Sequence, residues 1–161
     1  MRQILEHFND VPIELFPDKT VILSEGVKSG RLYALADGCL EVLRGETLIA
    51  TMDEPGSIVG EMSALLDAPH TATVRTVGET SLHVVTDGVA FLATKPELSW
   101  LIARLLARRL NAASTYLADL RRQFSGYGNH LELVGEVLES LMHEQPRLAS
   151  ALGSDRDDYQ E

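Results

Sequence analysis

Between two predicted β-strands stands the segment Gly60-Glu61-Met62-Ser63-Ala64-Leu65-Leu66-Asp67-Ala68-Pro69-His70-Thr71-Ala72-Thr73-Val74. It is too short for the full crossover helix that joins parallel strands. Gly60 lets a ligand approach the backbone closely, and residues 61–66 can form a short helix whose first amides point at negative charge. The segment therefore suits an anion, although a glycine-led turn is by itself weak evidence of a site.

The chain on either side of this segment is a series of short apolar runs broken by turn residues, which is typical of consecutive β-strands. The candidate strands are Thr20–Ser24, Arg31–Ala36, Cys39–Leu43, Thr47–Met52, Thr71–Thr76 and Ser81–Val85. Asp37-Gly38 predicts a tight hairpin, since glycine tolerates the positive φ that such turns need, and Arg44-Gly45-Glu46 and Val77-Gly78-Glu79 predict further turns. No strand alternates with a long helix, so we expect a sandwich or barrel of antiparallel strands.

Helical patterns replace the strands after Val85. Asp87 is a suitable N-cap for a short helix that ends near Thr94, and Pro96 is tolerated in the first turn of the next helix. This second helix is predicted to run from about Pro96 to Phe124. We expect Phe91 and Trp100 to pack where these helices meet the barrel.

The long predicted helix carries an a/d heptad seam, with spacings that alternate between four and three residues. Its members are Leu106, Leu110, Ala113, Leu117, Leu120 and Phe124. The seam could lie on the chain's own barrel or form the two-stranded contact of a homodimer. Arginines at 104, 108, 109, 121 and 122 fall outside it, which favours the dimer.

Ser125-Gly126-Tyr127-Gly128 breaks the long helix, and the remaining chain divides into two parts. One is a predicted amphipathic helix, about Asn129 to Gln145, and the other is a polar, acidic tail over 146–161. The expected organisation is therefore one domain over 1–124 that includes the helix 96–124, then a C-terminal helix within 125–145, then the tail.

Charge and composition limit the classes of function. The 161 residues carry 14 basic and 24 acidic side chains, a formal net charge of −10. This charge disfavours a general nucleic-acid binder, because such proteins neutralise phosphates with Lys and Arg. No run is long and apolar enough for a membrane span and residues 1–10 do not resemble a signal peptide, so we expect a cytoplasmic protein without membrane contact.

Metal and catalytic sites find no support in the residue pattern. Cys39 is the only cysteine, so no internal disulfide can form and a cysteine-based zinc site is implausible. The histidines outside the segment 60–74 lack metal-ligand spacing, and neither a Ser/His/Asp set nor a carboxylate pair stands at catalytic spacing. We expect neither a bound metal nor an enzyme.

Gly60-Glu61, an apolar run, Pro69 and then Thr71-Ala72-Thr73-Val74 resemble the phosphate-binding cassette of the cyclic-nucleotide-binding domain family, as in the catabolite activator and the protein kinase A regulatory subunits. The resemblance covers about Val11 to Phe124. It implies an α+β fold, an antiparallel β-roll or jelly-roll barrel of about eight strands. A short cassette helix, a long C-terminal dimerisation helix and one further helix complete this expected fold.

The resemblance also implies a ligand, cAMP or cGMP, and the residues that hold it. They are Gly60, Glu61, Met62, Ser63, His70, Thr71, Ala72 and Ser114. The amides of residues 60–62 would face the cyclic phosphate, Glu61 would accept a hydrogen bond from the ribose 2′-hydroxyl, and Thr71 would add phosphate contacts. Ser114 stands where bacterial members place a hydroxyl against the adenine, and an exposed helical serine is the alternative.

His70 departs from the family pattern, because nucleotide-binding members usually have arginine here, whose planar fork pairs with the cyclic phosphate. Losing a hydrogen bond to a charged group weakens binding by roughly ten- to a hundredfold. Three interpretations stay open: a weaker phosphate donor that acts when protonated, part of a pocket for another ligand, or the mark of a domain that has lost its ligand. Arg75 is near in sequence, but a solvated strand residue is its simpler interpretation.

Together these features predict a non-catalytic sensor that binds a cyclic nucleotide weakly, dimerises, and signals to a separate protein through the helix 129–145. The part of the chain after Phe124 is short and acidic, so we expect neither a helix-turn-helix domain nor direct nucleic-acid binding. A ligand-independent dimeric scaffold and a truncated Crp-Fnr-type regulator are the alternatives.

Overall fold

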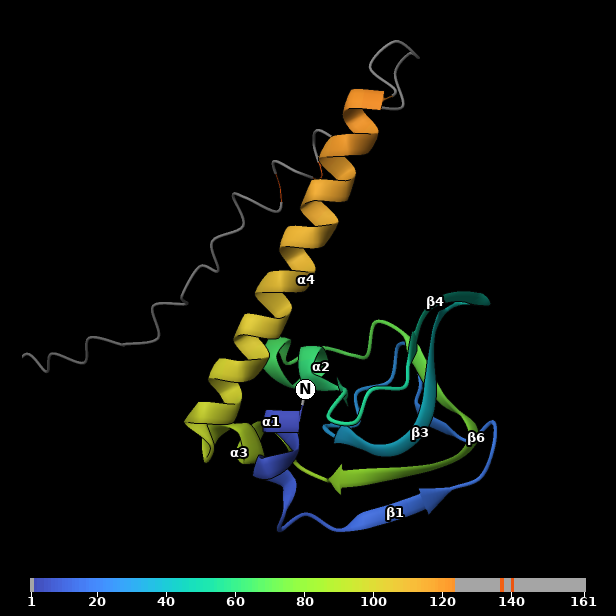
Figure 1. Cartoon of the computed structure of the whole chain (residues 1–161), viewed down its shortest axis with the longest axis vertical. Helices are drawn as coiled ribbons and strands as arrows, with labels where there is room; N and C mark the ends of the chain where they lie inside the picture. The colour runs from blue at the N-terminus through green and yellow to red at the C-terminus, as the bar shows by residue number, and fades with distance from the viewer. Residues whose placement is uncertain (1, 124–136, 138–139, 141–161) are drawn as a thin grey trace, which may run out of the picture. The chain divides into compact units, whose positions relative to one another are not determined.

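A computed structural model describes residues 2–123, 137 and 140 of the chain. Two long strands, β3 (Leu32–Arg44) and β6 (Thr73–Val85), form the centre of one antiparallel sheet (Figure 1). They pair along their whole length, from Leu32 opposite Val85 to Leu43 opposite Thr73.

Four short strands each pair with one half of a long strand. On β6, β2 (Val21–Leu23) pairs near the beginning and β1 (Ile13–Phe16) near the end. On β3, β5 (Ile58–Val59) pairs near the beginning and β4 (Thr47–Met52) near the end. All of these pairings are antiparallel, which confirms the predicted class of sheet.

Two of the predicted hairpins are wrong. The candidate strands 31–36 and 39–43 are one strand, β3, and the candidates 71–76 and 81–85 are one strand, β6. The described residues contain six strands, of which β1 and β5 were not among the candidates, where the family resemblance implied about eight. Gly38 (φ 100°) and Gly78 (φ 69°) lie where the pairing of β3 with β6 shifts register. A positive φ serves a bulge as well as a turn, so local sequence does not separate the two.

The third predicted turn is confirmed, since Gly45 and Glu46 join β3 to β4 with Arg44 opposite Thr47.

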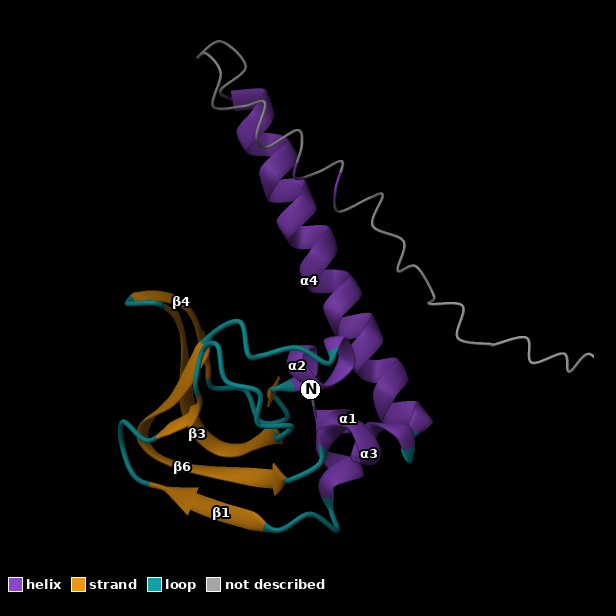
Figure 2. Cartoon of the chain, turned by 180° about the vertical axis from the view of Figure 1, so that it is seen from behind, coloured by secondary structure: helices purple, strands orange, loops and turns teal. Residues whose placement is uncertain are grey.

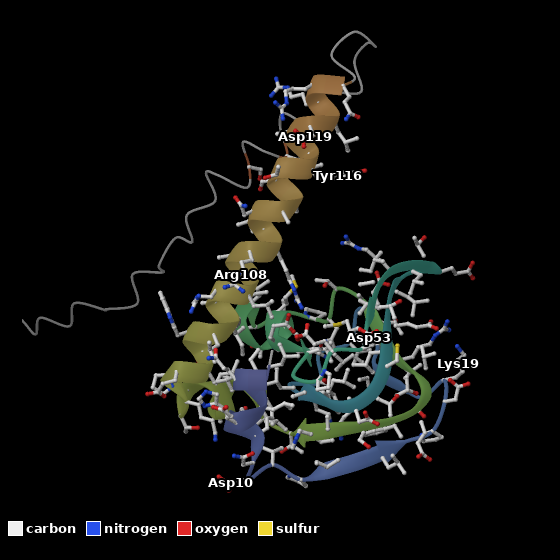
Figure 3. The ribbon with its side chains drawn as sticks, viewed as in Figure 1. Asp10, Lys19, Asp53, Arg108, Tyr116 and Asp119 are labelled. Carbon is white, nitrogen blue, oxygen red and sulfur yellow. The ribbon has the colours of Figure 1, made fainter. Side chains whose placement is uncertain are left out.

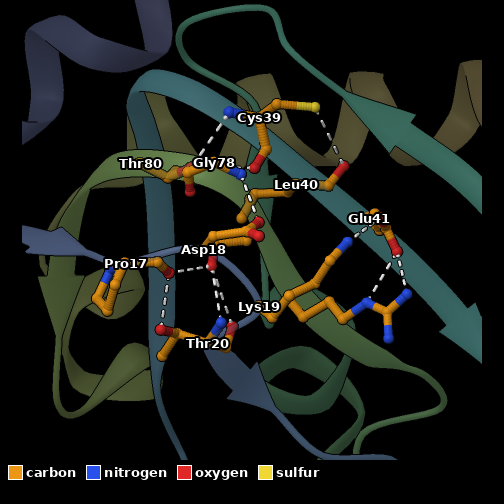
Figure 4. Close-up of polar contacts among 11 residues, drawn as sticks. Pro17, Asp18, Lys19, Thr20, Cys39, Leu40, Glu41, Gly78 and Thr80 are labelled. Carbon is orange, nitrogen blue, oxygen red and sulfur yellow. Dashed lines mark hydrogen bonds and ion pairs between the residues drawn. The ribbon is translucent and has the colours of Figure 1, made fainter.

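Thr80 replaces the ladder hydrogen bonds that are lost at the bulge (Figure 4). Its hydroxyl accepts from the Cys39 amide at 3.3 Å and donates to the Cys39 carbonyl at 3.1 Å. A Cβ at position 38 would lie 2.8 Å from the Thr80 Cα, so glycine is required there. The nearby loop before β2 is held to β6 in the same way, because the Asp18 carboxylate accepts from the Gly78 amide at 2.7 Å.

The two faces of the long strands bury different apolar clusters, as the two-residue period of a strand requires. Tyr33, Leu35 and Leu82 belong to one cluster on one side of the sheet. Leu32 and Ala34 belong to the other, which also receives the helices.

The helical elements of residues 2–107 lie together beside the sheet (Figures 1 and 2). They are α1 (Arg2–Leu5), the 3-10 helix η1 (Glu6–Phe8), α2 (Glu61–Leu66), α3 (Gly88–Ala93) and the start of α4 (Pro96–Gln123). Each contributes buried residues to the shared cluster, which are Ile4, Phe8, Ala64, Leu92, Leu98 and Ile102. Burying an apolar side chain of valine size or larger stabilises the fold by roughly 1.5–3 kcal/mol, so this cluster holds the helices mainly through its leucine, isoleucine and phenylalanine side chains, whereas α2 contributes only Ala64.

The predicted helices after Val85 are confirmed as far as the structure describes them, with one error in packing. Asp87 caps α3, since its carboxylate accepts from the Ala90 amide at 3.0 Å. Phe91 packs as expected, with its ring centroid 5.2 Å from that of Phe8. Trp100 does not, because it is 67% exposed. Leu98 and Ile102 form the packed face of α4, and Trp100 falls between them on the other side of the helix.

The chain forms two compact units, residues 1–107 and 108–161, which are described separately. In the first unit Leu106, the first member of the predicted dimer seam, packs against the helix-side cluster of its own chain. In the second unit Leu110 and Ala113 are exposed, while Leu117 and Leu120 are half-buried. Arg108, Tyr116 and Asp119 extend outward from α4 (Figure 3).

Several expectations fall on residues that are not described. Phe124 of the seam, the helix predicted at 129–145 apart from Val137 and Ser140, and the tail 146–161 lie outside the described residues. No helix in the described part of the chain is long and apolar enough to cross a membrane.

Candidate functional site

The turn from β5 into α2 depends on Gly60. Its φ is 92°, a conformation that residues with a Cβ rarely adopt. A Cβ at this position would lie only 2.4 Å from the carbonyl oxygen of Arg31, the residue before β3. The backbones of the two segments therefore approach as closely as glycine allows, which places the beginning of α2 against the beginning of β3.

The short helix α2 has a buried side and an exposed side. Glu61, Ser63 and Ala64 are buried, and Glu61 is only 4% exposed. Met62 and Leu65 are exposed. Glutamate is seldom buried unless its oxygens have hydrogen-bonding or ionic partners. A buried carboxylate directly after Gly60 is therefore a specific feature of this segment.

Hydrogen bonds within the segment close the turn after α2. Asp67 has a left-handed φ of 51°, and its amide donates to the Ser63 carbonyl. The Ser63 hydroxyl donates to the Ala68 carbonyl. The side chain of Ser63, which the family resemblance placed at the ligand, is thus used inside the segment.

His70 is held from both its backbone and its side chain by the loop between β2 and β3. Its amide donates to the Val27 carbonyl at 3.0 Å, and its carbonyl accepts from the Gly26 amide at 2.8 Å. Its Nε2 atom lies 2.7 Å from the Ser29 hydroxyl oxygen. The side chain is 5% exposed, and burial lowers the pKa of the imidazole below its ordinary value of 6.5. His70 is therefore mostly neutral at pH 7.

Arg75 is engaged away from this loop by an ion pair across β3 and β6. Its Nε and Nη2 atoms donate to the same Glu41 carboxylate oxygen at 2.8 and 2.6 Å. These bonds lower the pKa of Glu41, and Lys19 adds a weaker contact at 3.3 Å. The guanidinium of Arg75 is thus committed to the surface of the sheet.

The site residues expected from the sequence fall in both units of the chain, and their roles stay predictions. Residues 60–63 and 70–72 belong to one segment of the first unit, in which Thr71 is exposed and Ala72 half-buried. Ser114 lies in the second unit, where it is half-buried, and its role stays a prediction.

Ser29 was not predicted as a site residue. It is 41 residues from His70 and sits in a polar loop without any motif. Only the folded loop shows that it is a partner of His70.

Comparison with known proteins identifies the family. The model of the cyclic nucleotide-binding domain matches residues 13–93, which include β1 to β6, α2 and α3. The chain belongs to this family. The segment 60–74 of this cyclic nucleotide-binding domain lies inside the matched region, as the resemblance implied.

Relatives of known description agree with this assignment. The chain is 31% identical over 111 residues to the CRP-like cAMP-activated global transcriptional regulator of Mycobacterium tuberculosis (strain CDC 1551 / Oshkosh). The match covers 65% of this chain and 50% of that protein, so the chain spans about half the length of the curated relatives it matches.

Two solved structures share the fold. The catabolite activator protein of Thermus thermophilus is 25% identical with a TM-score of 0.59, over 89% of this chain and 82% of that one. The N-terminal domain of a transcriptional regulator from Streptomyces coelicolor A3(2) is 27% identical with a TM-score of 0.51, over 70% and 84%. The cyclic nucleotide-binding domain is therefore Crp-like, with the β-roll of that group.

No metal site accompanies this fold in the part of the chain that the structure describes. There, no three His, Cys, Asp or Glu residues lie close enough together to hold a metal ion.

Proposed function

We propose that this cyclic nucleotide-binding domain is a non-catalytic sensor that binds cAMP or cGMP weakly and signals to a separate protein. The observation that carries the proposal is the buried Glu61 directly after the Gly60 turn, inside the region that matches the family. A carboxylate held in this way is suited to accept a hydrogen bond from a ribose hydroxyl.

Each predicted site residue has a role in this proposal. The amides of residues 60–62 face the cyclic phosphate, the exposed Thr71 hydroxyl adds a contact, and Ser63 and Ala72 line the same site. Glu61 binds the ribose 2′-hydroxyl, and Ser114 on α4 contacts the base. None of these roles needs a metal ion.

The proposed weakness of binding follows from His70. Arginine offers a permanent charge and two parallel N–H groups to a phosphate. The buried imidazole of His70 is mostly neutral at pH 7 and already hydrogen-bonded to Ser29. Restoring the arginine should therefore raise affinity by roughly ten- to a hundredfold.

For signal output we propose a homodimer through the seam of α4. Ligand binding would move this helix relative to the sheet, and the segment 129–145 would contact the partner protein. The output is a protein contact in this proposal, so specific DNA binding in a gel-shift assay would contradict it.

Titration calorimetry with cAMP and cGMP at pH 6 and pH 8 tests the ligand. The wild-type chain should give saturable heat that strengthens at pH 6, because protonated His70 is the better phosphate donor. His70→Arg should bind more tightly, with little dependence on pH. If neither protein gives saturable heat, the proposed sensor of cAMP or cGMP is excluded, which favours a ligand-independent scaffold, a function that the Ser29–His70 contact would also fit.

A further inference from the structure

Ser29 and His70 form a bonded pair at the place in the segment where the family usually has one arginine. We propose that the two side chains act together as a composite hydrogen-bond donor for the ligand phosphate, with Ser29 as a ligand-binding residue. This inference rests on the proposed function, since it names a further residue of the same site.

The loop geometry places Ser29 at the surface above His70. Ser29 is exposed whereas His70 is buried, so the hydroxyl is the member of the pair that solvent and ligands reach. Three bonds fix the loop to His70: the two backbone bonds to Gly26 and Val27 and the 2.7 Å contact to Ser29. The hydroxyl is therefore held in place before any ligand arrives.

The number of protons on the two side chains limits how many hydrogen bonds the pair can donate to a ligand. A hydroxyl has one proton and two acceptor positions, and a neutral imidazole has one N–H and one acceptor nitrogen. The Ser29 oxygen already accepts from the Arg31 amide at 3.2 Å. If Nε2–H donates to the same oxygen, both acceptor positions of Ser29 are filled and its own proton points outward.

In the other tautomer the spare donor lies on a different atom. If Ser29 donates to Nε2, the imidazole proton is on Nδ1, and that N–H is the one left over. The neutral pair thus keeps one donor, which is one fewer than an arginine fork presents, and only in the first tautomer does that donor lie on the exposed Ser29 hydroxyl. Protonation of His70 supplies the second donor together with a positive charge, because Nε2–H then donates to Ser29 while both Nδ1–H and the hydroxyl remain.

An ion pair also joins this loop to the end of α2. Lys28, next to Ser29 in the loop, is 2.6 Å from the Asp67 carboxylate at the end of α2. These two charges are opposite in sign and neutralise each other, and both side chains are at least half exposed. Burial is the cause of the lowered pKa of His70, so a bound anion would act against it and favour the protonated pair.

The test compares Ser29→Ala with Ser29→Thr, which keeps the hydroxyl, and with Ser24→Ala, a serine of the same loop outside the pair. Each purified full chain is titrated with cAMP and with adenosine, which lacks the phosphate. We expect Ser29→Ala to weaken cAMP binding about tenfold and to leave adenosine binding unchanged. Ser29→Thr and Ser24→Ala should match the wild type.

Other outcomes separate this inference from the function on which it rests. If the wild-type chain and His70→Arg bind no nucleotide, the proposed function itself fails. If the wild type binds cAMP and Ser29→Ala binds it equally well, only the composite donor fails. Equal losses of cAMP and adenosine binding would also overturn it, because Ser29 would then act by holding the loop.

A measurement on the wild-type chain covers the case in which Ser29→Ala does not fold. Nitrogen-15 NMR of the histidine rings, with His70 assigned through His70→Gln, reports the tautomer and charge of the pair. Addition of cAMP should shift the His70 ring nitrogens and adenosine should not. Unchanged His70 signals at saturating cAMP would overturn the proposal.

Discussion

Gly60 controls the site at the scale of one residue. Its positive φ and the 2.4 Å separation of a would-be Cβ from the Arg31 carbonyl are two independent reasons for glycine. Gly45, in the turn between β3 and β4, also has a positive φ but has no neighbour within 4 Å of such a Cβ. Alanine substitutions at the two positions therefore distinguish the stability lost to an unfavourable backbone conformation from the stability lost to a steric clash.

Gly60→Ala should lower the free energy of unfolding by roughly 2–4 kcal/mol, and Gly45→Ala by only about 1 kcal/mol. Both alanines bear the conformational cost, and only the first must also push β3 aside. Urea unfolding measures both values. Equal losses would show that the close approach of Gly60 to Arg31 does not constrain the fold.

His70 should make stability depend on pH. Because burial lowers its pKa in the folded chain, the unfolded chain binds more protons below the ordinary value of 6.5. Stability contributed by the neutral imidazole is thus complete above pH 6.5 and is lost as pH falls toward the folded pKa. The free energy of unfolding can change by at most about 1.4 kcal/mol per pH unit for one proton.

Thermal or urea unfolding of the wild type and His70→Gln between pH 5 and pH 8 checks this dependence. The wild type should lose more stability than His70→Gln as the solution is acidified. His7→Gln is the control and should follow the wild type. Parallel curves for all three proteins would mean that His70 is not the group responsible.

At the scale of elements, the sequence predicts a cap or turn correctly when the residues that form it lie within a few positions of each other. The α3 cap needs only Asp87 and Ala90, and the confirmed turn needs only residues 44–47. Gly38 and Gly78 carry an equally clear local signal, yet they form a bulge because Thr80 and Cys39 meet across 41 residues.

Asp87→Ala should destabilise the chain by about 1 kcal/mol, since it removes the acceptor for the first turn of α3. Asp87→Asn keeps an acceptor oxygen and should lose only part of this. Denaturant unfolding compares the two. A loss for Asn as large as that for Ala would argue that charge, rather than capping, is what Asp87 contributes.

At the scale of the whole molecule, α4 changes its surroundings along its length. Leu98, Ile102 and Leu106 belong to the first unit and pack in its helix-side cluster, whereas Leu110 in the second unit is 49% exposed. The two interpretations of the heptad seam therefore apply to different parts of the helix. The beginning of the seam packs on the chain's own core, and the later part is left for a dimer contact. The dimer contact that we propose would begin at Leu110.

If the seam dimerises, the wild-type chain should sediment with the mass of two chains. Leu110→Glu combined with Leu117→Glu should give the mass of one, because each charge would be buried in the contact. Asn111→Glu, exposed and outside the seam, should remain a dimer. Analytical ultracentrifugation of the three proteins decides, and a monomeric wild type would remove the dimer from the proposal.

The family and the identity of the cassette were readable from the residues 60–74 alone. Their glycine, carboxylate and closing strand stand at fixed spacings inside one short segment, so the pattern can be recognised without knowing which distant residues they contact. The antiparallel class of sheet, the cap of α3 and the span of α4 as far as Gln123 follow from short-range periods in the same way.

The number of strands, the exposure of Trp100 and the partner of His70 were decided by the tertiary structure. Each depends on which distant segment packs against a residue: β6 against β3 at Gly38, the core against one face of α4, and the loop 26–29 against the cassette. The sequence of the segment 60–74 thus determines that a histidine replaces the usual arginine. Only the folded chain shows that Ser29 is the partner of this histidine, because a hydrogen bond between residues 41 positions apart has no local pattern.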